Sequence, residues 1–134
     1  MSSNKTGFKF KANHLAIMVN DLEKTGDFYS EVLQIEEIDI TATGLTHRWF
    51  KLENGLEIHL VSSPEMLPKK TRNNHLAIQT NDINTMTTYL EEKKIEYSDW
   101  FGNENKIQKR FDGVLQVYIT DPEGNWVEIN QKPN

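Results

Sequence analysis

The 134-residue sequence contains no cysteine, and this absence removes several kinds of site at once. Disulfide frameworks, thiolate zinc sites, iron–sulfur clusters and cysteine nucleophiles are all excluded. Glycine and proline are sparse, with 7 and 4 residues, and 37% of the chain is hydrophobic, which is typical of a globular protein and not of a disordered or fibrous one. Any metal bound by side chains must therefore have histidine, aspartate or glutamate ligands.

Positive charge and long apolar runs are also scarce. The 15 Lys and Arg residues are outnumbered by 20 Asp and Glu residues, which gives a formal net charge of −5 and disfavours nucleic acid and anionic membranes as partners. No apolar run approaches the roughly 20 residues of a membrane span, and residues 1–11 lack the apolar core of a signal peptide. We expect a soluble cytoplasmic protein with one domain over residues 1–134.

One stretch of nine residues occurs twice in the chain. Residues 13–21 and 74–82 are identical at seven of nine positions, and the two copies begin 61 residues apart. Agreement this close indicates that the protein consists of two copies of one module. We expect internal modules at about 11–62 and 73–131, joined by an exposed linker at 63–72.

Both copies show the same order of expected elements. Alternating apolar stretches at 14–19 and 75–80 predict strands, and Asp21 and Asp82 are suited to cap the amphipathic helix that follows each of them. Further strand-like runs surround a turn in each copy: 46–52 and 56–61 in the first, 115–120 and 125–130 in the second. Residues 98–113 are polar and predict a longer loop or a mobile lid.

Side chains alternate along a strand, so the parity of a residue assigns it to one face of the sheet. The helix-facing positions of the strands are apolar, whereas the open face carries a possible set of metal ligands: His14, His59, His75 and Glu128. A single histidine on a strand is more often structural, but His59 and Glu128 also match by their distance from the turn glycines Gly55 and Gly124. Imidazole nitrogen and carboxylate oxygen suit Zn, Ni, Mn, Co or Fe(II). We therefore predict one divalent metal ion per site.

Other residues near these positions receive different interpretations. Glu57 is expected to be solvated or to support a ligand, and His47 to line a pocket or lie at the surface. Arg48 has helix-facing parity and is expected to extend to solvent at a sheet edge, with no role toward substrate. Three aromatic residues share the parity of the open face and are expected to line the substrate pocket, with ordinary core packing as the alternative: Trp49, Tyr118 and Trp126.

The sequence resembles the vicinal oxygen chelate superfamily over residues 11–131. The residues that carry the resemblance are the paired Asn-His-Leu-Ala-Ile strands at 13–17 and 74–78, Phe28-Tyr29 of the first helix, and Asp-Pro-Glu-Gly-Asn-Trp-Val-Glu-Ile at 121–129. That superfamily includes glyoxalase I, fosfomycin-resistance thiol transferases, extradiol dioxygenases, methylmalonyl-CoA epimerase and bleomycin-resistance proteins. The resemblance implies an α+β fold of two tandem βαβββ modules, which form an open, barrel-like sheet around the metal.

The resemblance also places the ligands and indicates where this chain departs from glyoxalase I. His14, His75 and Glu128 fall on the three most regular metal positions of the superfamily, and His59 falls on the fourth, where glyoxalase I typically has a glutamate. Met18 and Ser63 replace an arginine and an asparagine that are typical of glutathione-binding glyoxalases, which argues against glutathione as cosubstrate.

The resemblance implies a metal-dependent, glyoxalase-like lyase or isomerase that chelates two adjacent oxygens of a small carbonyl compound, with Glu128 as the catalytic base. A fosfomycin-type thiol transferase and a small extradiol dioxygenase are alternatives within the superfamily. A non-catalytic protein of the bleomycin-resistance type, which sequesters a drug or metabolite, is the alternative from another class. Family precedent implies a homodimer, with sites formed within one chain or across two.

Overall fold

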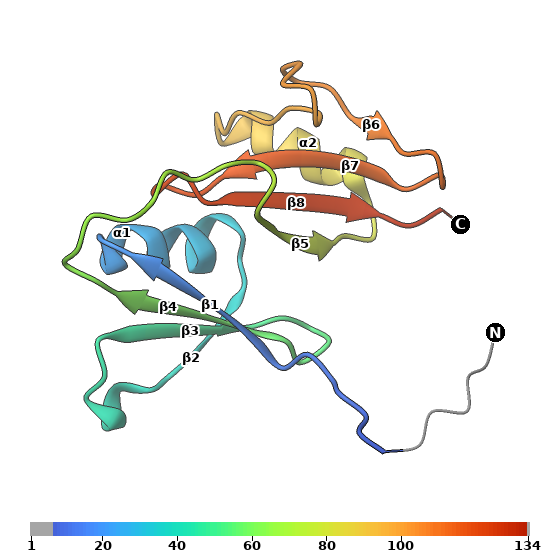
Figure 1. The fold of residues 1–134 in the computed structure, drawn as a ribbon. Coiled ribbons are helices and arrows are strands. Elements are labelled where there is room, and N and C mark those ends of the chain that lie inside the picture. The colour runs from blue at the N-terminus through green and yellow to red at the C-terminus, as the bar shows by residue number, and fades with distance from the viewer. Residues whose placement is uncertain (1–6, 134) are drawn as a thin grey trace. The chain divides into compact units, whose positions relative to one another are not determined.

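The computed structural model describes residues 7–133, which divide into two compact units with the boundary between Glu65 and Met66. Each unit combines a helix with a four-stranded sheet (Figure 1). The N-terminal unit contains β1 (His14–Val19), α1 (Leu22–Asp27), β2 (Glu36–Ile38), β3 (His47–Lys51) and β4 (Glu57–Ser62). The C-terminal unit contains β5 (His75–Gln79), α2 (Ile83–Glu92), β6 (Gln108–Lys109), β7 (Leu115–Thr120) and β8 (Trp126–Gln131). The prediction of an α+β protein with two βαβββ modules is therefore confirmed.

The two sheets have the same strand order. The N-terminal sheet runs β1-β4-β3-β2 and the C-terminal sheet β5-β8-β7-β6; the first pair in each is parallel and the others are antiparallel. In the parallel pairs Ala16 lies opposite His59, and Ala77 lies opposite Glu128. His59 and Glu128 therefore occupy equivalent places on central strands. Both sheets are open, and within residues 7–133 neither closes into a barrel.

The helices begin where the capping residues predict. The Asp21 side chain accepts a hydrogen bond from the backbone N–H of Lys24, and the Asp82 side chain accepts from those of Asn84 and Thr85. The first helix does not continue as one α-helix, because α1 ends at Asp27 and a five-residue π-helix follows at Phe28–Val32.

One face of each sheet is apolar and buried. Its fully buried strand residues are Val19, Phe50, Ile58 and Leu60 in the N-terminal unit, and Val117, Ile119, Val127 and Ile129 in the C-terminal unit. The parity predicted for β4 and β8 is thus correct. The parity argument fails for Leu15 of β1, which is 40% exposed although its position predicts packing on the helix. β1 is the edge strand and pairs only with β4, which leaves one side of Leu15 uncovered.

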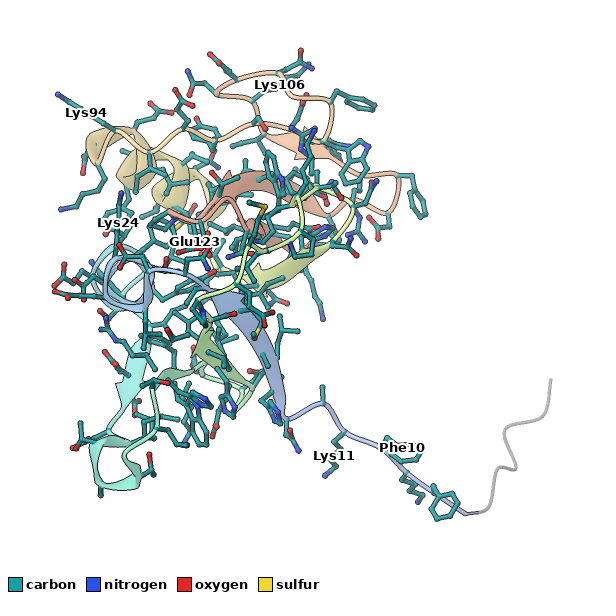
Figure 2. The ribbon with its side chains drawn as sticks, turned by 60° about the vertical axis from the view of Figure 1, so that its left-hand side comes forward. Phe10, Lys11, Lys24, Lys94, Lys106 and Glu123 are labelled. Carbon is teal, nitrogen blue, oxygen red and sulfur yellow. The ribbon has the colours of Figure 1, made fainter. Side chains whose placement is uncertain are left out.

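The segment before β1 is extended and presents aromatic side chains to solvent. Phe8 and Phe10 are almost fully exposed, and Figure 2 shows Phe10 and Lys11 on the part of the chain that leads into β1. These residues do not contribute to the core of the N-terminal unit. Among residues 7–133 no helix has the length and apolar character needed to cross a membrane.

Arg48 of β3 connects the sheet of the N-terminal unit to α1. Its guanidinium forms a fork to the Glu37 carboxylate with distances of 2.8 and 2.7 Å, and Nη1 donates to Asp27 Oδ1 at 2.9 Å and to the Glu23 carbonyl at 3.0 Å. Its side chain is only 20% exposed. The expectation that Arg48 extends to solvent is therefore wrong, because two carboxylates and a helix carbonyl hold it beside Gly26 of α1.

We expect Gly26→Ala to destabilise the protein by about 1–3 kcal/mol, although alanine is the better helix former. A Cβ at residue 26 would overlap the Arg48 side chain and force the guanidinium away from Asp27. Urea unfolding of the single variants and of Gly26→Ala with Arg48→Met measures this coupling. In the Arg48→Met background, Gly26→Ala should cost nothing or stabilise by up to about 1 kcal/mol. Equal effects in both backgrounds would contradict the proposed overlap.

Candidate functional site

Glu128 lies in the middle of the face of the C-terminal sheet that points away from the apolar core. It is on β8, between β5 and β7, and the register places Tyr118 directly opposite it. His75 is at the start of β5. Glu128 is only 4% exposed, so the face predicted to be open is covered at this point. A buried carboxylate needs partners, and the neighbouring strands supply them.

The imidazole of His75 is held between a backbone carbonyl and Glu128. Nδ1 is 2.8 Å from the Arg72 carbonyl oxygen, which can only accept a hydrogen bond, so Nδ1 carries a proton. Nε2 is 3.0 Å from Glu128 Oε1. In the neutral ring Nε2 carries a lone pair, and a lone pair that faces a carboxylate oxygen requires a proton or a metal ion between them. A histidine fixed by a carbonyl on its other nitrogen is typical of a metal ligand.

Two hydrogen bonds fix the carboxylate of Glu128. The Tyr118 hydroxyl donates to Oε1 at 3.0 Å, and Asn130 Nδ2 donates to Oε2 at 2.7 Å. Nη1 of Arg110 is 3.9 Å from Oε2. Burial, together with the bond to Glu128, raises the pKa of Tyr118 above its ordinary value of 10.0, so its hydroxyl remains a proton donor at neutral pH.

Part of segment 98–113 is attached to this face and contributes an aromatic ring. Ser98 exchanges two backbone hydrogen bonds with Tyr118, at 3.0 and 2.8 Å. This attachment brings the ring centroid of Trp100 to 5.6 Å from that of Tyr118 and 6.5 Å from that of His75. Arg72 donates to the Trp100 carbonyl and lies 4.5 Å above the Trp126 ring. The linker predicted at 63–72 is therefore not free at its C-terminal end.

The open face of the N-terminal sheet carries a stack of three rings. His59 lies between Trp49, with centroids 3.8 Å apart and ring planes at 3°, and His14, at 4.3 Å and 11°. His59 Nε2 is 2.9 Å from Glu57 Oε1, and His14 Nδ1 is 2.6 Å from Asn13 Oδ1. A metal ion bound by an imidazole lies near the ring plane, so two stacked parallel rings cannot both bind one ion until one of them turns.

The structure thus brings the predicted site residues together in pairs. His14 lies beside His59 in one unit, and His75 lies beside Glu128 in the other; within residues 7–133 no group of three or more His, Asp or Glu side chains is placed to hold a metal ion. The aromatic residues predicted to bind substrate contact these groups differently. Trp49 stacks on His59 and Tyr118 binds Glu128, whereas Trp126 lies under Arg72.

Several residues around Glu128 have no role predicted from the sequence. Asn130 could have been found, since it has the same parity as Glu128 on β8. Arg110 could not, because it follows β6 in a stretch for which the sequence predicts a loop. Trp100 and Arg72 gave no such signal because they lie outside the strands. Glu57 matches the interpretation as a residue that supports His59.

The fold and the two faces define a protein of paired βαβββ modules that presents histidine and carboxylate groups from equivalent strands. The model of the Glyoxalase/Bleomycin resistance protein/Dioxygenase superfamily matches residues 11–129. Because this match covers most of the sequence, the chain belongs to that superfamily.

The chain is similar to individual proteins over most of its length. The chain is 30% identical over 128 residues to the uncharacterized protein YwbC of Bacillus subtilis (strain 168), an alignment that covers 91% of this chain and 98% of YwbC. A crystal structure of a Bacillus anthracis protein assigned to the glyoxalase family has a TM-score of 0.77 and 23% identity, covering 96% of this chain and 100% of that one. The fosfomycin resistance protein FosX of Listeria monocytogenes has a TM-score of 0.71 and 22% identity, with coverage of 94% and 96%. At these identities the structures show a shared fold.

We expect Tyr118→Phe to destabilise the protein by about 1–3 kcal/mol, because the variant removes a hydroxyl donor from the buried Glu128 carboxylate and keeps the ring. Urea unfolding at neutral pH measures the difference. In the Glu128→Gln background the same change should cost less, since the amide carries no charge that the hydroxyl must stabilise. If Tyr118→Phe is as stable as the wild type, the hydroxyl does not support Glu128.

Proposed function

We propose that the protein is a metal-dependent enzyme of this superfamily that acts on a small compound with two adjacent oxygens. The observation that carries the proposal is the contact of His75 Nε2 with Glu128 Oε1, combined with the bond from His75 Nδ1 to the Arg72 carbonyl. A pair of this kind, in which the carboxylate is buried and the outer atoms are fixed by hydrogen bonds, supports metal binding. Superfamily membership supports the same proposal.

The donor atoms of the two residues suit a divalent ion. His75 and Glu128 are the residues of the C-terminal unit that would hold such an ion, through one imidazole nitrogen and one carboxylate oxygen that already lie next to each other. His75 Nε2 and Glu128 Oε1 are 3.0 Å apart. Nitrogen and oxygen donors of this kind suit Zn, Ni, Mn, Co or Fe(II), and we propose one such ion per site.

His14 and His59 complete the proposed ligand set. Their use requires one of the two rings to leave the stack, and Glu57 would then hold the ring of His59 through Nε2. His14 is the more exposed ring and is the one we expect to turn. The four ligands would come from one chain or from two chains of a homodimer, and sedimentation velocity measures whether the expected dimer forms.

In the proposed reaction Glu128 moves a proton. A divalent ion in such a site supplies stabilisation of the negative charge that develops on two neighbouring substrate oxygens. With Oε1 directed toward His75, Glu128 Oε2 would accept the proton from a substrate carbon beside a carbonyl and return it to the adjacent carbon. Asn130 orients Oε2 through its hydrogen bond, and Tyr118 keeps Oε1 in place. Trp100 would limit the access of water from one side.

The fosfomycin-type reaction is the second candidate, and the likeness to FosX supports including it in an assay panel. A dioxygenase reaction and sequestration of a drug or metabolite without turnover are the remaining alternatives. The hydrogen bonds that orient both oxygens of Glu128 favour proton transfer over simple sequestration, because storage of an apolar drug gives no reason to bury an oriented carboxylate.

We expect purified protein to bind a divalent ion, and His75→Ala and Glu128→Ala each to weaken Zn²⁺ binding by at least about 100-fold, because each change removes a ligand from the set. Equilibrium dialysis with elemental analysis measures this. His47→Ala is the matched control: it removes a histidine of the neighbouring strand β3 that is outside the set, and it should leave the affinity within about threefold. A wild-type protein that takes up none of Zn, Ni, Mn or Fe(II) would contradict the proposal.

We expect the metal-loaded protein to isomerise the hemithioacetal of methylglyoxal, and Glu128→Gln to lower kcat by about 100-fold or more, because glutamine cannot accept the proton. A second prediction follows from the same role: turnover should slow when the transferred hydrogen is replaced by deuterium. The panel includes fosfomycin with thiols or water, and catechols with oxygen. Turnover of only one of these would select the corresponding alternative, and metal binding with ligand capture but no turnover would select sequestration.

A further inference from the structure

A row of amide side chains lies beside the row that contains Glu128 on the C-terminal sheet. The register places Asn130 of β8 opposite Gln116 of β7, and Gln116 opposite Gln108 of β6. Residues directly opposite one another share a face, and Asn130 is two residues from Glu128 on the same strand. The amide row is therefore about 6.7 Å along the strands from the pair formed by Glu128 and Tyr118.

The two outer amides of this row are engaged within the protein. Asn130 Nδ2 donates to Glu128 Oε2 at 2.7 Å. Gln108 Oε1 accepts from the backbone N–H of Trp100 at 2.8 Å, and so holds segment 98–113 on the sheet. Each of these side chains has a structural reason to be an amide.

Gln116, between them, has no such reason. It is 4% exposed, and its Oε1 is buried without a hydrogen-bond partner among residues 7–133. A buried acceptor without a donor destabilises the folded state, and an apolar side chain of similar size would avoid this cost. The fold does not require an amide here, since the equivalent position in the N-terminal sheet is His47, which lies opposite Val61 as Gln116 lies opposite Asn130.

The N-terminal unit also has a buried polar atom without a hydrogen-bond partner within residues 7–133, at the position equivalent to Gln116. His47 Nδ1 is also buried without a partner among the residues that the structure describes. In both units this atom lies on the strand beside the one that carries a proposed ligand, and on the face of that ligand. The two copies thus have different polar groups at one position of the sheet, each with a buried atom that is unpaired within the described part of the chain.

We propose that Gln116 determines substrate specificity: Oε1 accepts a hydrogen bond from a hydroxyl or amide N–H on the part of the substrate that extends beyond the group held at Glu128. The proposal rests on the proposed function. An unpaired carbonyl oxygen selects a hydrogen-bond donor, and a hydroxyl or amide N–H enters a buried place at a lower desolvation cost than an ammonium group. Of the charged groups around this row, Glu128 is bound to Asn130, and Arg110 is bound to Asp112 in an exposed ion pair. The substrate class is therefore a compound with two adjacent oxygens and a hydroxyl or amide N–H on the part that reaches the amide row, which lies roughly 6–7 Å along the strands from Glu128.

The first test compares thermal unfolding of Gln116→Met and Gln108→Met. Methionine keeps the length of the side chain without its polar atoms. Removing the unpaired Oε1 should raise Tm of the Gln116→Met protein by about 3 °C or more, whereas Gln108→Met removes a formed hydrogen bond and should lower Tm. A lowered Tm for Gln116→Met would show that Gln116 has a structural role and would overturn the proposal.

The second test measures binding of hydroxamates to the Zn²⁺-loaded protein by calorimetry. Benzohydroxamate presents two adjacent oxygens to a metal ion, and its 3-hydroxy and 4-hydroxy derivatives add a donor farther away, which the matched methoxy compounds lack. In the wild type at least one hydroxy compound should bind about tenfold more tightly than its methoxy counterpart. Gln116→Met should lose this preference and retain the affinity for unsubstituted benzohydroxamate within about threefold.

The outcomes separate the two proposals. Equal binding of hydroxy and methoxy compounds to the wild type, or a preference that survives in Gln116→Met, would overturn the role of Gln116 while leaving the metal site in place. Failure of unsubstituted benzohydroxamate to bind the wild type would overturn the metal-dependent function, and with it the assignment of Gln116 to that substrate.

Discussion

The parallel pairing of β5 with β8 is the constraint on which the arrangement around Glu128 depends. It makes β8 a central strand, so the carboxylate has a neighbouring strand on each side and little access to water. A charged group in that place is tolerated only if the flanking strands supply donors or a cation. Tyr118 on β7 is one donor, and His75 on β5 directs its nitrogen at the same oxygen. The charge of Glu128 thus determines what its neighbours must be.

The internal repeat and strand parity are enough to predict the module order and the face that carries His75, Tyr118 and Glu128. They succeed because the alternation of side chains is a local property, which the sequence displays directly. Trp100 and Arg72 could not be predicted in the same way. Their positions follow from where segments outside the strands fold back onto the sheet, and such segments have no periodic pattern.

The contacts of Arg48 could not be predicted from the sequence, for a different reason. Its parity correctly indicates the helix-facing side of β3, but a charged residue on that side suggests an extended side chain at a sheet edge and not a partly buried ion pair with α1. The partly buried position is possible because Gly26 has no Cβ, which leaves room on α1, and because Asp27 and Glu37 converge on the guanidinium. That match joins residues 21 and 11 positions away, so no local pattern reveals it.

The two modules share a backbone plan but stabilise their central groups by different means, and the difference follows from the chemistry of those groups. His59 and Glu128 occupy equivalent positions, each opposite an aromatic residue of the next strand. An imidazole has a flat face, so the ring of Trp49 can cover it by stacking. A carboxylate requires a proton donor, and at the same position Tyr118 supplies a hydroxyl. The aromatic residue on β3 or β7 thus suits the group opposite it. Tryptophan stacks on the imidazole of His59 in one unit, and tyrosine donates a hydrogen bond to the Glu128 carboxylate in the other.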